Sequence, residues 1–176
     1  GLRDLDVTAN LCVCSHGHGD HHGDSCVKTE ESLVRNPFRI ETVESWHDDE
    51  GGSRRGPNTI HIFHGEEMKI IHMGDIGCRP ENWQMDLLKG ADAVMAPAGG
   101  FYTAEPSVIY EIIKEIRPRV VIPMHYRTAG SGFPVLKTCE EFLSYCSNVV
   151  RYETDTLVLD KETGNQTAVL KQWACR

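Results

Sequence analysis

The sequence predicts a mixed α/β sandwich. Segments with helical periodicity alternate with short apolar strands, several strands form hairpin-like pairs, and neither a repeat nor an internal linker interrupts the chain. The chain has 176 residues, of which 40% are hydrophobic, and a domain of this size buries roughly 70% of the surface of its unfolded chain. We therefore expect one domain over residues 1–176.

The N-terminal half is expected to contain mainly strands. Segments 38–45 and 59–64 alternate apolar and polar residues, as half-buried strands do. Between them, the Gly-rich segment 48–58 is a loop long enough to suggest a function. We predict further strands at 11–14, 69–73 and 91–96, and a short helix at 83–88.

The C-terminal half contains the clearest helix, at 106–117. Pro106 lies near its first turn, Pro118 ends it, and apolar residues recur at helical spacing between them. A second helix is predicted at 138–147, with Thr138 as N-cap and Glu141 completing a capping box. We predict strands at 119–124, 149–152, 156–159 and 167–170.

Composition excludes several classes of protein. The 25% of charged residues is close to the globular average, which argues against a disordered tail or a coiled coil. No apolar run approaches the roughly 18 residues of a membrane span, and residues 1–6 show no signal-peptide pattern. The net charge of −8 disfavours nucleic acid as a partner. We expect a cytoplasmic protein with no membrane contact, whose seven cysteines are reduced.

Histidines are concentrated in one loop. Residues 15–23 read SHGHGDHHG, so four potential metal ligands fall within six residues: His16, His18, Asp20 and His21. In an extended segment, residues i and i+2 point the same way, so the first two can converge on one ion. The intervening glycines let the backbone turn and carry the others towards a second ion. Imidazoles with a carboxylate suit zinc in an open catalytic site, with manganese or iron as alternatives.

Three further candidates lie at the ends of predicted strands: His47, Asp75 and His125. Loops at strand ends bring distant residues together. Any one of the three, taken alone, is equally consistent with a surface or capping residue. Their equivalent positions predict a common site.

These motifs resemble the ordered metal motifs of the metallo-β-lactamase superfamily. The stretches GDIG (74–77), AGGFYT (98–103) and IPMHYRT (122–128) are similar to a bacterial and archaeal branch of metal-dependent hydrolases that includes the ascorbate-6-phosphate lactonase-like proteins. The resemblance covers residues 11–128 strongly and implies a four-layer αββα sandwich with a two-metal site at one edge of its sheets. Fewer residues precede His16 here than in the family. We therefore expect either a fragment lacking part of the N-terminal strands, or an unpaired sheet edge that forms a homo-oligomer.

The resemblance also implies roles for the ligands. His16, His18 and His47 would hold the first ion, Asp20, His21 and His125 the second, and Asp75 would bridge both. Two such ions roughly 3.5–4 Å apart share a hydroxide whose pKa is lowered to near neutrality, which provides a nucleophile. Asp20 could also orient this hydroxide.

Other polar residues are weaker candidates. His72, on the strand that carries Asp75, could donate a proton to the leaving group or support a ligand, and His22 could support one too. His61 and His64 are expected to be exposed strand residues. Arg54, Arg55 and Arg127 lie in loops beside ligands and could bind a substrate anion, with Tyr102 and Tyr126 as site walls.

Three function classes follow. The first is a metal-dependent hydrolase of a small anionic ester, lactone or phosphoester. The second is a cyclic-nucleotide phosphodiesterase or a nuclease of the same superfamily. The net charge of −8 argues against the nuclease. The third is a non-hydrolytic diiron or metal-binding protein. In the diiron redox branch a glutamate usually replaces the second motif histidine, so His18 argues against it.

Overall fold

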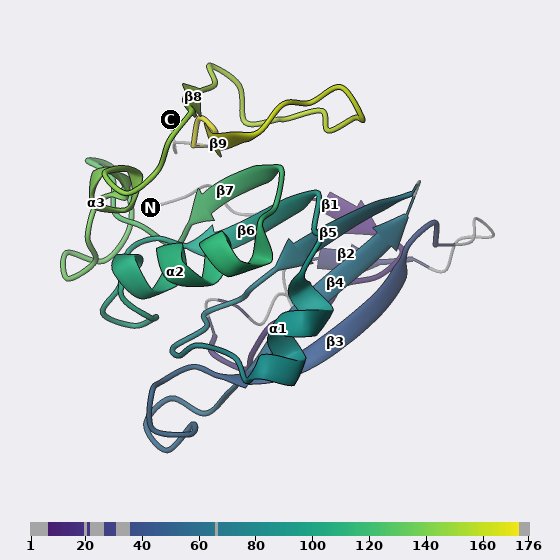
Figure 1. Ribbon diagram of the computed structural model, residues 1–176. Coiled ribbons are helices and arrows are strands. Elements are labelled where there is room, and N and C mark those ends of the chain that lie inside the picture. The colour runs from purple at the N-terminus through teal and green to yellow at the C-terminus, as the bar shows by residue number, and fades with distance from the viewer. Residues whose placement is uncertain (1–6, 20, 22–26, 31–35, 66, 173–176) are drawn as a thin grey trace.

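A seven-stranded sheet forms the centre of the computed structural model, which describes residues 7–19, 21, 27–30, 36–65 and 67–172 (Figure 1). The strand order is β3-β4-β5-β6-β7-β9-β8. The strands span Arg39–Trp46 (β3), Pro57–Gly65 (β4), Met68–His72 (β5), Ala93–Pro97 (β6), Val120–Met124 (β7), Val149–Arg151 (β8) and Gln166–Val169 (β9).

Strand direction places three chain segments at one edge of this sheet. β3 is antiparallel to β4 and β4 is antiparallel to β5, so β3 and β5 run the same way. β5, β6 and β7 are parallel neighbours. The carboxyl ends of β3, β5 and β7 therefore meet at the same edge, and the residues that follow these strands include His47, Asp75 and His125.

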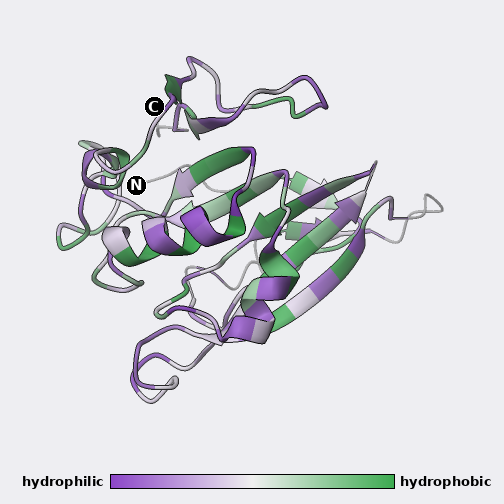
Figure 2. Cartoon of the chain, viewed as in Figure 1, coloured by the Kyte–Doolittle hydropathy of each residue, from purple (hydrophilic) through white to green (hydrophobic). Residues whose placement is uncertain are grey.

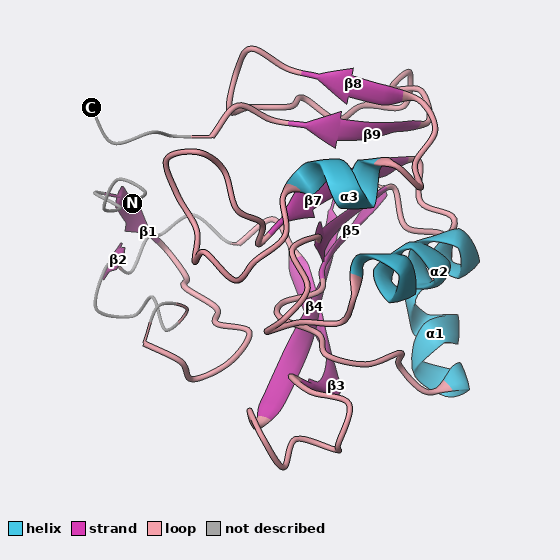
Figure 3. Ribbon diagram, turned by 90° about the vertical axis from the view of Figure 1, so that its left-hand side faces the viewer, coloured by secondary structure: helices cyan, strands magenta, loops and turns pink. Residues whose placement is uncertain are grey.

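Helices and a second, smaller sheet lie on opposite faces of the central sheet. The helices α1 (Asn82–Leu88) and α2 (Pro106–Ile116) cover one face, and α3 (Cys139–Leu143) follows β7 and contacts α2. On the other face lies a parallel pair, β1 (Val7–Ala9) and β2 (Val27–Thr29) (Figure 3). The α/β sandwich predicted from the sequence is confirmed.

Helix α2 supplies a large part of the core. Ile109, Ile112, Ile113 and Ile116 are buried against the sheet, as the spacing of apolar residues predicted. The helix ends where Arg117 adopts a left-handed conformation at φ 56°, just before Pro118. Figure 2 shows that β6 and β7 beneath it are largely hydrophobic, as expected for parallel strands buried on both faces. Within the described residues, no helix is both long enough and apolar enough to cross a bilayer.

Three predicted elements differ from the structure. Segments 11–14 and 156–159 are not strands. Both are short apolar runs, and neither has a partner strand in the ladder among the described residues. The second predicted helix ends at Leu143 rather than at residue 147, and single turns complete the segment. A short segment adopts a strand only when a neighbour pairs with it, which its own composition does not reveal.

Candidate metal centre

Four imidazoles converge on the carboxylate of Asp75 at the sheet edge described above. Oδ2 of Asp75 lies 3.0 Å from Nε2 of His125 and 3.4 Å from Nε2 of His47. It lies 3.5 Å from Nε2 of His21 and 3.8 Å from Nε2 of His16. The carboxylate is 4% exposed. Segments remote in sequence thus place their donor atoms within one small volume.

The donors form two overlapping groups that could each hold a metal ion. In the first group, His16, His18 and His47 have ligand atoms within 4.8 Å of one another. In the second, His16, His21 and Asp75 meet the same limit. The sequence-based sets also included His125, which lies next to Asp75, and Asp20, which falls outside the described residues. The structure therefore brings together every described member of the predicted ligand set.

Close backbone packing fixes the turn that carries Asp75. Gly74 has φ 59°, and a Cβ there would lie 2.2 Å from Oδ1 of Asn58, so only glycine fits. Asn58 is buried, and its Oδ1 accepts the backbone N–H of Asp75 at 2.8 Å. Its Nδ2 donates to the carbonyl of Met73 at 2.9 Å and to Oγ of Ser45 at 2.8 Å. Asn58 thereby clamps both sides of the turn.

Two further glycines allow the other ligand loops to approach. A Cβ at Gly77 would lie 2.3 Å from the backbone nitrogen of Asp48, so the turn after Asp75 packs directly on the segment that carries His47. A Cβ at Gly99 would lie 2.3 Å from the carbonyl oxygen of His125. Small residues at these positions let three strand ends share one site.

Both the protonation state and the orientation of the His16 ring suit a role as a metal ligand. Burial, opposed by the charge of Asp75 and reinforced by the neighbouring imidazoles, lowers its pKa to about 4. The ring is therefore neutral near pH 7 and keeps a lone pair. Its Nδ1 lies 3.0 Å from Oγ of Ser15, whereas its buried Nε2 has no hydrogen-bond partner among the described residues. A buried polar atom without a partner is costly, and a cation at this position would satisfy it.

The charge of Asp75 also suits a cation. Burial alone would raise the pKa of its carboxyl, but hydrogen bonds from His125 and His47, together with the charges of His125 and His21, hold this pKa well below its usual range. Asp75 is therefore ionised at any physiological pH. The donor set of imidazoles and one carboxylate, without thiolate, matches the ligand preference of zinc in open sites.

His72, His61 and His64 belong to neither of the two groups of candidate ligands. His72 lies on β5 opposite His61, and its Nδ1 accepts the backbone N–H of Gly74 at 3.1 Å. It is not among the residues that line the cavity at the metal cluster, and its role as a proton donor stays a prediction. His64 is half-buried beside Glu41, and His22 lies outside the described residues.

The prediction that His61 is an exposed strand residue is wrong. His61 is 6% exposed and stacks on Phe63 with ring centroids 6.1 Å apart. It lies on β4, which is an interior strand between β3 and β5. Burial lowers the pKa of its imidazole, so the ring is neutral and packs as a core residue.

A cavity of about 300 Å³ opens at the metal cluster, and only some of the predicted substrate-binding residues line it. Arg55 and Tyr102 line it, together with Phe133. Arg54 does not line it and instead pairs with Glu50 on an exposed loop. Nε of Arg127 donates to the carbonyl of Leu136 at 3.0 Å, and this side chain belongs to a different cavity.

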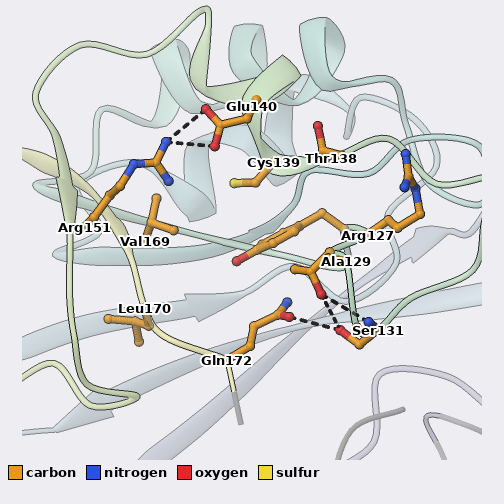
Figure 4. A pocket seen from close by; sticks show the side chains of 13 residues that line it. Arg127, Ala129, Ser131, Thr138, Cys139, Glu140, Arg151, Val169, Leu170 and Gln172 are labelled. Atoms are coloured by element: carbon orange, nitrogen blue, oxygen red, sulfur yellow. Dashed lines mark hydrogen bonds and ion pairs between the residues drawn. The ribbon is translucent and has the colours of Figure 1, made fainter. Parts of the chain in front are cut away.

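The larger cavity, of about 610 Å³, lies between α3, the end of β9 and the loop after His125 (Figure 4). Tyr126 lines this cavity rather than the metal cluster. Several polar side chains that line this cavity are paired with one another. Arg151 forms two hydrogen bonds with Glu140, at 2.8 and 2.9 Å, and Ser131 donates to Gln172 at 3.0 Å. Arg127 also lines this cavity, where it donates to the carbonyl of Leu136 and forms no ion pair with a carboxylate of the described residues.

Several residues that shape the site were not among those predicted from the sequence. Asn58 and Phe133 carried no periodic or motif signal, because their roles depend on which loops meet in space. Asp48 was recognisable, since an aspartate followed by a Gly-rich loop is typical of side-chain-to-backbone turns. Its carboxylate accepts four backbone N–H groups, from Glu50, Gly52, Arg54 and Arg55.

Fold and site together define an α/β domain with an imidazole-rich metal centre at a sheet edge, and comparisons with known proteins identify its family. Residues 1–125 match the model of the β-lactamase superfamily domain. The chain therefore belongs to the metallo-β-lactamase superfamily, as the sequence motifs predicted.

Two relatives and one solved structure are consistent with this family assignment. A metal-dependent hydrolase from Desulforamulus reducens is 27% identical over 72% of this chain and 71% of its own length. Another from Methanopyrus kandleri is 26% identical over 89% and 79%. A solved structure of a metallo-β-lactamase superfamily protein from Thermotoga maritima superposes with a TM-score of 0.75 at 28% identity, covering 94% of this chain and 84% of that one.

Proposed function

We propose that this protein is a metal-dependent hydrolase that cleaves a small anionic ester, lactone or phosphoester at a dinuclear centre suited to zinc. The convergence of four imidazole Nε2 atoms on Oδ2 of Asp75, all within 3.8 Å, carries this proposal. The names of the relatives from Desulforamulus reducens and Methanopyrus kandleri support the reaction class.

Each described ligand has a place in this scheme. His16, His18 and His47 would hold one ion, His21 and His125 a second, with Asp20 added to the second set by the family resemblance, and Asp75 would bridge both. Bound ions would polarise the oxygen of the scissile group and lower the pKa of a coordinated water towards neutrality.

The chain's own residues orient and stabilise this site. Ser15 fixes the ring of His16 through Nδ1, so that Nε2 faces the cluster. Asn58 holds the turn of Asp75, whose ionised carboxylate balances the charge of the cations. Contacts that orient a metal ligand in this way usually change metal affinity by roughly 10- to 100-fold.

The cavity indicates a small and anionic substrate. A volume of about 300 Å³ is at the lower end of the range for ligand sites. Arg55 lines it and forms no ion pair with any carboxylate in the described part of the chain. A guanidinium in this position matches a carboxylate or phosphate group of the substrate.

Metal analysis combined with hydrolysis of a substrate panel tests the proposal. We expect stoichiometric zinc in the purified protein and chelator-sensitive turnover of at least one lactone, phosphodiester or thioester. Asp75→Ala should lower turnover by at least about 1,000-fold, because it removes a shared ligand and its charge. Asp86→Ala, on the exposed surface of α1, is the matched control and should retain wild-type turnover. Unchanged turnover in Asp75→Ala, or a diiron optical spectrum, would contradict the proposal.

A further inference from the structure

An aromatic wall borders the metal cluster. Phe101, Tyr102 and Phe133 form a continuous set of edge-to-face contacts, with centroid distances of 4.9 Å and 5.8 Å. Tyr102 and Phe133 line the same cavity as the imidazoles. Phe101 is 53% exposed and Phe133 is 55% exposed. Exposed apolar surface that gathers beside a polar centre indicates a ligand contact, because folding gains nothing from it.

The backbone holds this wall rigidly in a strained conformation. Phe101 has φ 60°, in the left-handed region that a phenylalanine rarely adopts. The carbonyl of Gly99 accepts the N–H of Lys137 at 2.8 Å, and the N–H of Ala104 donates to the carbonyl of Ile76 at 2.8 Å. The loop is therefore tied to the turn that follows Asp75. The strain is maintained at the position where it displays an aromatic ring beside the site.

Arg55 places a positive charge on this wall. Its guanidinium carbon lies 5.6 Å from the centroid of the Tyr102 ring. The carboxylate of Asp48 fixes the loop by accepting the backbone N–H of Arg55 at 2.8 Å and that of Arg54 at 3.0 Å. Arg54 itself pairs with Glu50, so Arg55 is the arginine left to bind an external anion at this cavity.

We propose that Arg55, Tyr102 and Phe133 form a recognition wall that selects substrates in which a carboxylate or phosphate adjoins a planar unsaturated ring. Guanidinium groups bind such anions, and aromatic side chains favour a planar ring over a saturated ring of equal size. This inference rests on the proposed hydrolase function, since it names the substrate class of that site.

Two matched ligands test the preference directly. Benzoate and cyclohexanecarboxylate carry the same charge and the same number of carbon atoms, so contacts of the carboxylate with metal or with Arg55 are common to both. Calorimetry on the zinc-loaded protein should show that benzoate binds about 3- to 10-fold more tightly. Cyclohexanecarboxylate is the more hydrophobic ligand, so nonspecific burial would give the opposite order.

Variants assign the preference to individual residues. Phe133→Leu keeps apolar volume but removes the ring, and should bring the affinity ratio close to one. Arg55→Gln should weaken both ligands by a similar factor and leave the ratio unchanged. Trp83→Leu is the matched control, because Trp83 is 58% exposed on α1 and lines none of the cavities described above. The melting temperature of each variant confirms that it folds.

The outcomes separate this inference from the proposed function. Equal affinity for the two ligands in wild type, or a ratio that Phe133→Leu does not change, overturns the recognition wall even if chelator-sensitive hydrolysis is found. A benzoate preference that depends on Phe133, in a protein without metal-dependent turnover, supports the wall and overturns the hydrolase.

Discussion

Asn58 shows how much one uncharged side chain contributes to this site. All three of its hydrogen bonds are buried, and they connect Asp75, Met73 and Ser45. In Asn58→Ala the partners at Asp75 and Met73 lose their hydrogen bonds while still buried. We expect the free energy of unfolding to fall by about 3 kcal/mol, together with weaker zinc binding. Urea denaturation and zinc titration measure the two effects.

A matched variant tests whether these effects follow from the position of Asn58 or from any Asn→Ala substitution. Asn165→Ala changes an exposed asparagine for which no side-chain hydrogen bond to the described residues is found. It should leave both stability and zinc affinity within about 0.5 kcal/mol of wild type. If Asn58→Ala binds zinc as tightly as Asn165→Ala does, the clamp does not position Asp75.

The buried thiol of Cys139 gives a second prediction for a single residue. Burial, reinforced by the nearby charge of Glu140, raises its pKa from 9.0 to about 12. At pH 8 the reactive thiolate is therefore about 1,000-fold less abundant than for an ordinary thiol. Iodoacetamide followed by peptide mass spectrometry should label Cys139 slowly in the folded protein and rapidly in denaturant. Equal rates in the two states would show that the site is open to solvent.

Site residues could be predicted where the signal is local in the sequence. They could not be predicted where their role depends on the path of a loop in space. His16, His18 and His21 were recognisable because ligand spacing within a Gly-rich segment is a local property. Arg55 and Arg127 were equivalent in the sequence, since both lie in loops beside a ligand. Only the paths of those loops direct one towards the cavity at the metal cluster and the other towards a backbone carbonyl.

At the scale of elements, the loop after β3 is organised by Asp48. Its Oδ1 accepts the N–H groups of Glu50 and Gly52, and its Oδ2 accepts those of Arg54 and Arg55. In Asp48→Asn an NH2 group, which cannot accept a hydrogen bond, replaces one of the two carboxylate oxygens. Two of the four backbone N–H groups therefore lose their acceptor, whichever way the side chain is oriented. We expect the loop to loosen and the KM for anionic substrates to rise roughly 10-fold, with a smaller effect on kcat.

The neighbouring aspartate provides the control for this loop. Asp49→Asn removes the same charge from an exposed side chain in the same segment. Steady-state kinetics should show a KM close to that of wild type for this variant. If both variants raise KM equally, loss of negative charge near the cavity explains the effect and the backbone contacts of Asp48 do not.

Helices and strands could be predicted where residues within the segment itself determine its structure. Helix α2 begins at Pro106 and ends at Ile116, almost as predicted, because its proline signals and apolar stripe are local. Strands β3 to β7 were also located correctly, within one or two residues at each end. The segments 11–14 and 156–159 have strand-like composition, but the sheet offers them no pairing partner among the described residues. Pairing depends on the whole topology, which composition cannot supply.

At the scale of the whole molecule, the metal centre connects parts of the chain that are distant in sequence. Its ligands come from the loop at residues 15–21 and from the ends of β3, β5 and β7. In the unfolded chain these groups are separated and have no common position. A metal ion that binds the assembled site therefore binds the folded state selectively and should stabilise the whole domain.

Thermal unfolding with different metals tests this coupling. At a free zinc concentration of about 1,000 times Kd, selective binding adds roughly 4 kcal/mol, which corresponds to a rise in Tm of about 8–16 °C for a chain of this size. Magnesium and calcium prefer oxygen ligands and should give almost no shift. His16→Gln should abolish most of the zinc effect, whereas His64→Gln, whose imidazole pairs with Glu41 outside the centre, should retain it. Equal zinc shifts in both variants would assign the stabilisation to other groups, such as cysteine thiols, and would contradict the role of the histidine cluster.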